Sequence, residues 1–253
     1  MRKPKVLVLR APGSNCDRET AVAWEYVGGE AELVHINELV RGEKALSGYQ
    51  ILTIPGGFTY GDDLGAGKLL ANDFLYCLQE HLTRFVESQR PILGICNGFQ
   101  VLVKTGLLPE ATLYANDSGR FECRWVYLKS VNRGRCIWTR EIDGLTYLPV
   151  AHAEGKFVPA GEEALKRLID EDRLVFTYVD ERGEQGGYPA NPNGAVADIA
   201  GACDETGLIF GLMPHPERHI LPYHHPRWTR RGEERDGDGV VIFRNGIKYV
   251  SEA

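Results

Sequence analysis

The chain has 253 residues, with 29 Lys and Arg against 35 Asp and Glu, giving a formal net charge of −6. This length suits one large α/β domain or two small ones, and the acidic balance argues against a nucleic-acid or anionic-membrane partner. The six cysteines include no Cys-x-x-Cys pair. The first apolar run is too short for a signal peptide or a membrane span. We therefore predict a cytoplasmic protein with free thiols.

The first segments indicate a strand, a helix and a second strand. Lys5–Leu9 is an apolar run, and Asn15 or Asp17 can cap a helix that Gly28-Gly29 ends. Glu32–His35 is the second predicted strand. A βαβ unit implies a parallel sheet, in which ligands bind beyond the carboxyl ends of the strands.

A third strand is predicted over Tyr49–Ile54, and the glycines Gly56 and Gly57 follow it. Adjacent glycines let the backbone approach a ligand and present its N–H groups, although a tight turn has the same composition. We expect an oxyanion and substrate loop here, because this strand is a plausible neighbour of the central one. A long helix from about Ala66 to Gln89 should follow, with its apolar residues in the core.

The central motif is Gly94-x-Cys96-x-Gly98, between a short apolar strand and a helix that ends near Gly106. This arrangement is the sulfur counterpart of the nucleophile elbow known with serine. A helix N-terminus favours a thiolate, and its free N–H groups can stabilise an oxyanion. The alternative is that Cys96 is a small buried hydrophobe at the end of a strand.

The second half of the chain changes character. Cys123–Leu128 and Tyr147–Val150 indicate antiparallel strands. The later predicted elements are a helix over Glu162–Asp170, strands over Leu174–Val179, Ala195–Ala200 and Leu208–Met213, and a closing helix or strand over Gly239–Ile247. No linker divides the sequence. We predict an α/β fold in a single domain, residues 1–253, with an open, mostly parallel sheet and an antiparallel insertion.

His215 is flanked by prolines, which exclude a helix there. On an extended segment Glu217, two residues further on, points the same way and can orient a protonated imidazole. The pair suggests a general base with its orienting carboxylate, and the alternative is a rigid turn with a surface histidine. His152 also precedes a glutamate by two residues, so it is a competing base that we rank lower.

The remaining histidines and cysteines suggest no further metal or catalytic site. Three histidines follow the His-Pro-Glu motif without the spacing of a closed zinc site, and we predict no metal there: His219, His224 and His225. Four cysteines are expected to be buried and structural: Cys77, Cys123, Cys136 and Cys203. The loop of Cys16, in contrast, should lie near the ligand-binding edge of the sheet.

Three segments resemble the class I (triad) glutamine amidotransferase family, which has a flavodoxin-like glutaminase domain with helices on both faces of its sheet. They are Pro55-Gly56-Gly57, Gly94–Gln100 and His215-Pro216-Glu217. The resemblance implies hydrolysis of L-glutamine through a Cys96 thioester, with His215 as base and Glu217 as its partner. It also implies that the backbone N–H groups of Gly57 and Asn97 hold the oxyanion, and that Gln100 and Gly56-Gly57 contact glutamine.

Within this family the chain is similar to the subfamily of glutaminase subunits that serve phosphoribosylformylglycinamidine synthase. Five motifs carry that similarity: Pro12–Asp17, Gly56–Asp62, Asn116–Phe121, His152–Phe157 and Met213–Arg218. The similarity implies a PurL-type synthetase, with a small PurS-type subunit, that uses the ammonia to make formylglycinamidine ribonucleotide in purine biosynthesis. ATP and Mg²⁺ are expected on the synthetase and no cofactor on this chain, which has no Walker-type loop. The tail after Arg218 is longer and richer in His and Arg than the small form of this subunit leads us to expect.

Two other functions are compatible with parts of this pattern. A free-standing Cys-His hydrolase could use the same fold and the same residues without any acceptor for ammonia. A non-catalytic regulatory subunit could retain the fold alone, although it would have no physical need for Cys96, His215 and Glu217 together.

Overall fold

The computed structural model describes residues 3–231 and 236–252. Its main feature is a nine-stranded sheet in the order β2-β1-β3-β4-β11-β10-β9-β6-β7, and β5 and β8 form a separate two-stranded sheet. The strands are β1 (Lys5–Arg10), β2 (Glu30–His35), β3 (Ile51–Ile54), β4 (Ile92–Ile95), β5 (Ala111–Tyr114), β6 (Glu122–Ser130), β7 (Leu145–His152), β8 (Lys156–Pro159), β9 (Leu174–Val179), β10 (Ile199–Cys203) and β11 (Ile209–Leu212).

The sheet is parallel from β2 to β11 and antiparallel from β11 to β7. At its centre β4 lies between β3 and β11, with Leu93 in register with Thr53 on one side and Phe210 on the other. The predicted α/β fold with an open parallel sheet and an antiparallel insertion is confirmed. Because β1, β3, β4 and β11 run the same way, the loops that follow them meet at one edge of the sheet.

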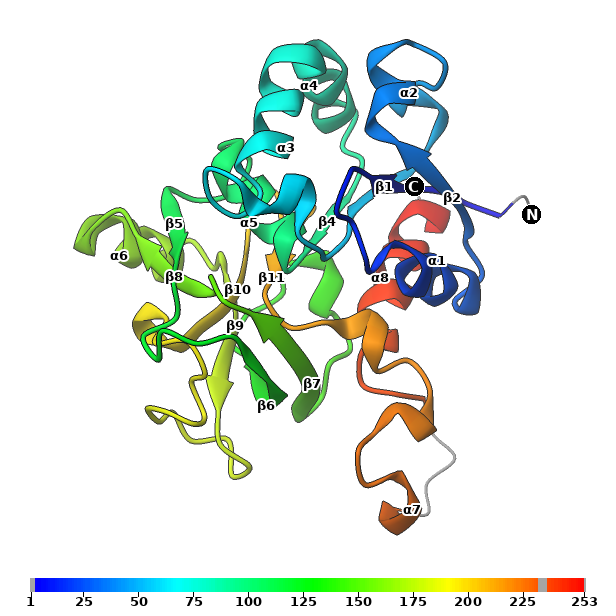
Figure 1. The fold of residues 1–253 in the computed structure, drawn as a ribbon. Helices are drawn as coiled ribbons and strands as arrows, with labels where there is room; N and C mark the ends of the chain where they lie inside the picture. The colour runs from blue at the N-terminus through cyan, green and yellow to red at the C-terminus, as the bar shows by residue number, and fades with distance from the viewer. Residues whose placement is uncertain (1–2, 232–235, 253) are drawn as a thin grey trace.

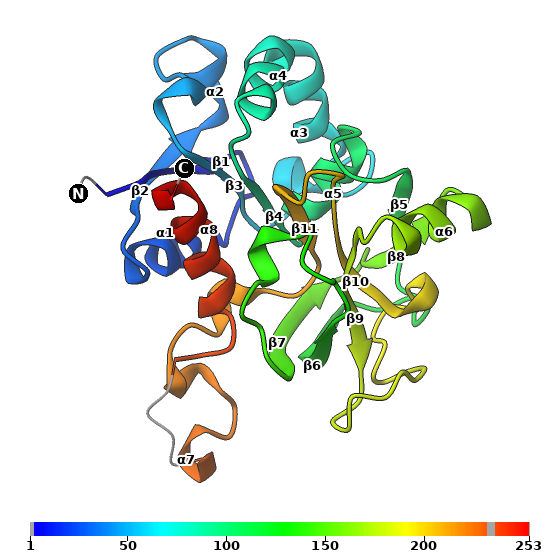
Figure 2. The same cartoon turned by 180° about the vertical axis from the view of Figure 1, so that it is seen from behind.

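Helices cover both faces of the sheet. In Figures 1 and 2, α1 and α8 lie together on one face, and α3, α4 and α5 lie on the other. The helices are α1 (Asp17–Tyr26), α2 (Ile36–Val40), α3 (Lys68–Asn72), α4 (Gln79–Glu87), α5 (Asn97–Lys104), α6 (Glu162–Asp170), α7 (Trp228–Arg231) and α8 (Val240–Glu252). The segment that carries α7 projects away from the sheet (Figure 1), whereas the tail returns to pack α8 against α1.

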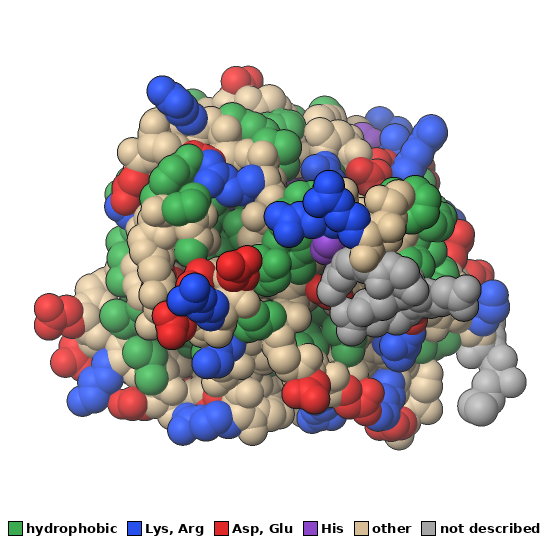
Figure 3. All heavy atoms as spheres, turned by 90° about the horizontal axis from the view of Figure 1, so that it is seen from below, with side chains coloured by type: hydrophobic (Ala, Val, Ile, Leu, Met, Phe, Trp, Pro, Cys, Tyr) green, Lys and Arg blue, Asp and Glu red, His purple; other side chains and the backbone are tan. Residues whose placement is uncertain are grey.

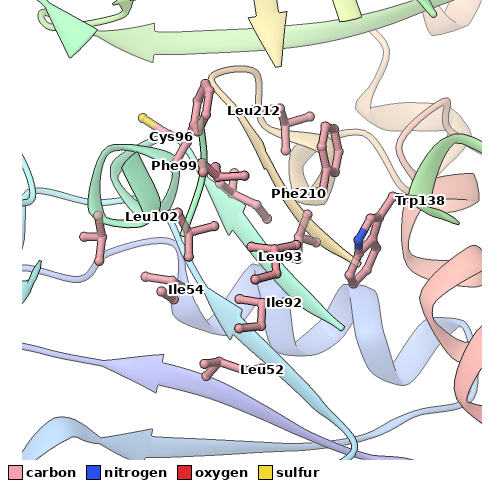
Figure 4. Close-up of a cluster of buried hydrophobic side chains, with 14 of the residues drawn as sticks. Leu52, Ile54, Ile92, Leu93, Cys96, Phe99, Leu102, Trp138, Phe210 and Leu212 are labelled. Carbon is pink, nitrogen blue, oxygen red and sulfur yellow. The ribbon is translucent and has the colours of Figure 1, made fainter. Parts of the chain in front are cut away.

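The core follows from the apolar strands and the inward faces of these helices. On the face of α5, Phe99 and Leu102 lie close to Leu93 of β4, as Figure 4 shows. On the opposite face the Trp24 ring of α1 meets the Phe243 ring of α8 edge-on, with ring centroids 5.0 Å apart. Burying large aromatic rings of this kind is a main source of folding free energy.

The long helix predicted from Ala66 to Gln89 is interrupted. Between α3 and α4, residues Asp73–Cys77 form a π-type turn, in which the Leu78 N–H donates to the Asp73 carbonyl at 3.2 Å. The Asp73 side chain accepts a hydrogen bond from the Tyr60 hydroxyl at 2.6 Å. A tertiary contact thus fixes the position of the π-type turn that interrupts the helix. The spacing of the apolar residues alone did not predict this interruption.

Other predicted elements differ in detail. The strand expected from Ala195 begins only at Ile199, after a short 3₁₀ turn in which Ala197 has φ 51°. The segment left open as helix or strand is the helix α8. The expectation that four cysteines are buried is wrong for Cys77 and Cys123, which are exposed, whereas Cys136 and Cys203 are buried.

Charges of both signs lie on the face of the molecule that is seen from below (Figure 3). On the face drawn in Figure 3, acidic and basic side chains are interspersed, and neither sign covers the face. Within the described ranges, 3–231 and 236–252, no helix combines the length and apolar character needed to span a membrane.

The close approach of α5 to β3 depends on Gly98. A Cβ atom there would lie 1.9 Å from the Ile54 carbonyl oxygen. We expect Gly98→Ala to lower the free energy of unfolding by about 2 kcal/mol or more, because the helix must move off the sheet. Urea unfolding would measure this effect. Gly48→Ala is the control: Gly48 has open space around it, and equal losses for the two variants would contradict the packing explanation.

Candidate active site

The turn at Cys96 has an unusual backbone. Cys96 lies between β4 and α5 with φ 51° and ψ −105°, a conformation that residues with a side chain rarely adopt. Its N–H donates to the Leu212 carbonyl at 2.8 Å. A Cβ on Gly94 would lie 2.7 Å from the Gly98 carbonyl oxygen, so the residue at each end of the turn must be glycine. The Cys96 sulfur points away from the hydrophobic cluster (Figure 4).

His215 and Glu217 follow β11 and lie at the same edge of the sheet. The His215 N–H donates to the Pro149 carbonyl at 2.8 Å, which ties the segment to β7. Its Nδ1 lies 2.6 Å from Glu217 Oε1, and both side chains are buried. Among the described residues Nε2 has no hydrogen-bond partner, and it is the ring nitrogen left to interact with the Cys96 sulfur.

The surroundings of His215 favour its protonated form. Burial alone would lower the pKa of His215, but the Glu217 carboxylate and the sulfurs of Cys96 and Cys16 outweigh burial and hold that pKa well above its ordinary value. A protonated imidazole between a carboxylate and a sulfur is the charge arrangement that a thiolate nucleophile requires.

The Gly56-Gly57 loop packs directly on His215. A Cβ on Gly56 would lie 2.7 Å from His215 Cε1, and one on Gly57, where φ is 153°, would lie 2.8 Å from the Gly13 carbonyl oxygen. Within residues 3–231 and 236–252 neither the Gly57 nor the Asn97 backbone N–H donates a hydrogen bond. Both are therefore available to a substrate oxygen.

The side chains of Asn97 and Gln100 hold neighbouring loops in place. Asn97 accepts a hydrogen bond from the Thr59 hydroxyl at 2.7 Å and donates to Asp62 and to Gln100 Oε1 at 3.1 and 3.0 Å. Gln100 Nε2 in turn donates to the Glu154 carbonyl at 2.5 Å. The Gln100 side chain thus accepts one hydrogen bond at Oε1 and donates one from Nε2 within the protein. Its second Nε2 hydrogen remains for another partner.

The competing histidine lies nearby in a different environment. His152 is 2% exposed, its Nδ1 lies 3.1 Å from Asn116 Oδ1, and its ring packs against Gly155. Burial, with the positive charge of His215 adding to it, lowers the pKa of His152 to about 3. His152 is therefore neutral at physiological pH and cannot supply the proton that an ammonia leaving group needs.

Cys16 and Arg218 are two neighbours of His215 for which the sequence motifs predict no catalytic role. The Cys16 sulfur lies 3.9 Å from His215 Nδ1 and accepts a hydrogen bond from Arg218 Nη2 at 2.9 Å. Donor atoms of Cys16, His215 and Glu217 lie within 4.8 Å of one another, as in a metal site. A cation there would have to break the His215–Glu217 hydrogen bond and face the Arg218 guanidinium, so the geometry favours the hydrogen-bonded arrangement.

Comparison with known proteins identifies the family. The family model of a CobB/CobQ-like glutamine amidotransferase domain matches residues 3–250. The phosphoribosylformylglycinamidine synthase subunit PurQ of Dehalococcoides mccartyi is 50% identical over 260 residues, covering 100% of both chains. The PurQ subunit of Methanococcus maripaludis is 43% identical, with 98% of each chain covered.

Structural similarity points the same way. A chain in the solved structure of PurLQS from Thermotoga maritima aligns with a TM-score of 0.78 and 32% sequence identity. The alignment covers 98% of this chain and 100% of that one. The chain therefore belongs to the CobB/CobQ-like glutamine amidotransferase family and, within it, to the group of PurQ subunits of phosphoribosylformylglycinamidine synthase.

Proposed function

We propose that this chain, as one domain over residues 1–253, hydrolyses L-glutamine to glutamate and ammonia with Cys96, His215 and Glu217 as its catalytic residues. The observation that carries the proposal is the buried His215 ring, whose Nδ1 binds Glu217 Oε1 at 2.6 Å and whose pKa is raised by Glu217 and the Cys96 sulfur. Family membership makes the chain a glutamine amidotransferase and supplies the substrate class.

The first step forms a thioester. The Cys96 thiolate attacks the side-chain amide carbon of glutamine, and the carbonyl π electrons move onto oxygen. The backbone N–H groups of Gly57 and Asn97 bind this oxyanion, each contributing about 3 kcal/mol of transition-state stabilisation. His215 then donates its proton to the amide nitrogen, the C–N bond breaks, and ammonia leaves.

The second step releases glutamate. The now neutral His215 takes a proton from water, and the resulting hydroxide attacks the γ-glutamyl thioester carbon. Collapse of the second tetrahedral intermediate breaks the C–S bond and returns the thiolate beside a protonated His215. Glu217 holds the ring in one tautomer through both steps. Gln100 and the Gly56-Gly57 backbone contact the glutamine, with Gln100 using its remaining Nε2 hydrogen.

The ammonia passes to a partner. The PurQ names of full-length relatives and the similarity to a chain of PurLQS support a PurL synthetase as that partner, in the cytoplasmic synthesis of formylglycinamidine ribonucleotide. We assign ATP and Mg²⁺ to the synthetase and include a small PurS-type subunit in the assembly. The loops Asn116–Phe121 and His152–Phe157 would face the synthetase, because Asn116 accepts the Gly155 N–H at 3.0 Å and so links the two loops close to the site.

The alternatives fit the observations less well. A free-standing Cys-His hydrolase would share the three catalytic groups but would show no response to a synthetase. A non-catalytic regulatory subunit would not need a buried carboxylate to raise the pKa of His215.

Cys96→Ala should abolish glutamate release. We expect the loss to be at least about 10³-fold, because no other group can form the thioester. The assay measures glutamate with and without a PurL-type synthetase, ATP and formylglycinamide ribonucleotide. The wild-type chain should release glutamate slowly without the synthetase and faster with it. Cys203→Ala is the control, because it also removes a buried thiol. Glutamate release by Cys96→Ala would refute the mechanism. Wild-type glutamate release that does not change when the synthetase is added would instead favour the free-standing hydrolase.

His215→Ala and His152→Ala should have different effects. Loss of His215 should reduce thioester formation by about 10²-fold or more, because the leaving ammonia loses its proton donor. His152, whose pKa is about 3, gains no proton across the assay range of about pH 5 to 9, so its removal should leave both limbs of the pH–rate profile in place. Single-turnover trapping of the thioester measures both variants. Loss of thioester formation in His152→Ala alone would reverse the assignment of the base.

A further inference from the structure

We propose that Cys16 and Arg218 are positioning residues, which together hold the His215–Glu217 pair from the side opposite the reacting thiol. The inference rests on the proposed function, in which His215 carries the proton. Neither residue touches the substrate in this scheme. Both act through His215 and Glu217.

The first observation is the way the Cys16 thiol is fixed. Cys16 is 1% exposed, and its N–H donates to the Gly56 carbonyl at 3.2 Å. Its S–H donates to Asn15 Oδ1 at 3.1 Å, while its sulfur accepts from Arg218 Nη2 at 2.9 Å. The sulfur, 3.9 Å from His215 Nδ1, therefore presents its lone pairs to the protonated side of the ring.

The second observation concerns Glu217. Its Oε1 binds His215 Nδ1 at 2.6 Å and lies 3.9 Å from Arg218 Nε, whereas Oε2 is buried and has no hydrogen-bond partner among the described residues. A buried carboxylate with so few partners is costly unless cations compensate it, and the protonated His215 ring is the nearer of the two cations here. Arg218 supplies the second positive charge, and the same guanidinium reaches Cys16, so it links the two neighbours of Nδ1.

The third observation is packing against the oxyanion loop. A Cβ on Gly56 would lie 2.7 Å from His215 Cε1 and 3.2 Å from the Cys16 sulfur. Cys16, Gly56 and His215 are thus in mutual contact, so the residue at position 16 helps to set the spacing between the base and the loop that holds the oxyanion. Misplacement of these groups by about 1 Å is enough to slow a reaction substantially.

The charged and titratable groups that face His215 come from several elements. Glu217 and Arg218 follow β11, Cys16 precedes α1, Cys96 precedes α5, and His152 ends β7. Glu217, Cys96 and Cys16 favour the protonated ring, and His152 is neutral. Removing the Cys16 sulfur withdraws one favourable interaction, so His215 should lose its proton at a lower pH.

The test uses the complex with a PurL-type synthetase and measures glutaminase kcat, KM and the pH–rate profile. Arg218→Gln should lower kcat about tenfold with little change in KM, because the base is misplaced while glutamine still binds. Arg218→Lys should recover part of kcat, since it restores the charge. In Cys16→Ala the midpoint of the fall in kcat at high pH should move down by about half a pH unit. The midpoint for Cys16→Ser should lie between those of the wild type and Cys16→Ala.

Cys203→Ala and denaturant unfolding of every variant separate these effects from a loss of stability. If Arg218→Gln does not fold, the pH–rate profiles of Cys16→Ala and Cys16→Ser alone test the positioning role. Folded variants that keep the wild-type kcat and the wild-type pH limb would overturn the positioning role alone. A wild-type complex that releases no glutamate would instead overturn the proposed function.

Discussion

The left-handed backbone of Cys96 is the constraint on which the site depends. The turn is possible only because Gly98 lets α5 approach the Ile54 carbonyl and because the Cys96 N–H finds an acceptor at Leu212. These contacts join β3, β4 and β11 at their carboxyl ends. The strain of one residue is thus balanced by the packing of three strands, and the thiol is displayed at the place where the other site loops converge.

The site is also an electrostatic unit within a largely apolar interior. His215 and Glu217 are both almost inaccessible to water, so their interaction is screened little by solvent or salt. Burial alone would favour a neutral imidazole, as it does for His152. Two histidines in one region thus have opposite protonation states, because only one has a carboxylate against its ring.

The loops around the site are tied to each other by side chains that also belong to the motifs. Asn97 joins α5 to the loop after β3, and Gln100 joins α5 to the turn between β7 and β8. A disturbance in that turn can therefore reach the helix that follows Cys96. This connection offers a physical route by which a synthetase docked near the Asn116–Phe121 loop could influence glutamine hydrolysis.

The sequence by itself determined the α/β class, the elbow around Cys96 and the pairing of His215 with Glu217, because each of these depends on local spacing and on residues that tolerate sharp turns. Only the tertiary structure decided the interruption of the helix between α3 and α4, the exposure of Cys77 and the neutral state of His152. It alone placed Cys16 and Arg218 beside the His215–Glu217 pair, since residues 202 positions apart in the chain are joined here by a single N–H···S contact. Local patterns encode periodicity and turns, whereas burial and long-range contacts exist only once the whole chain is packed.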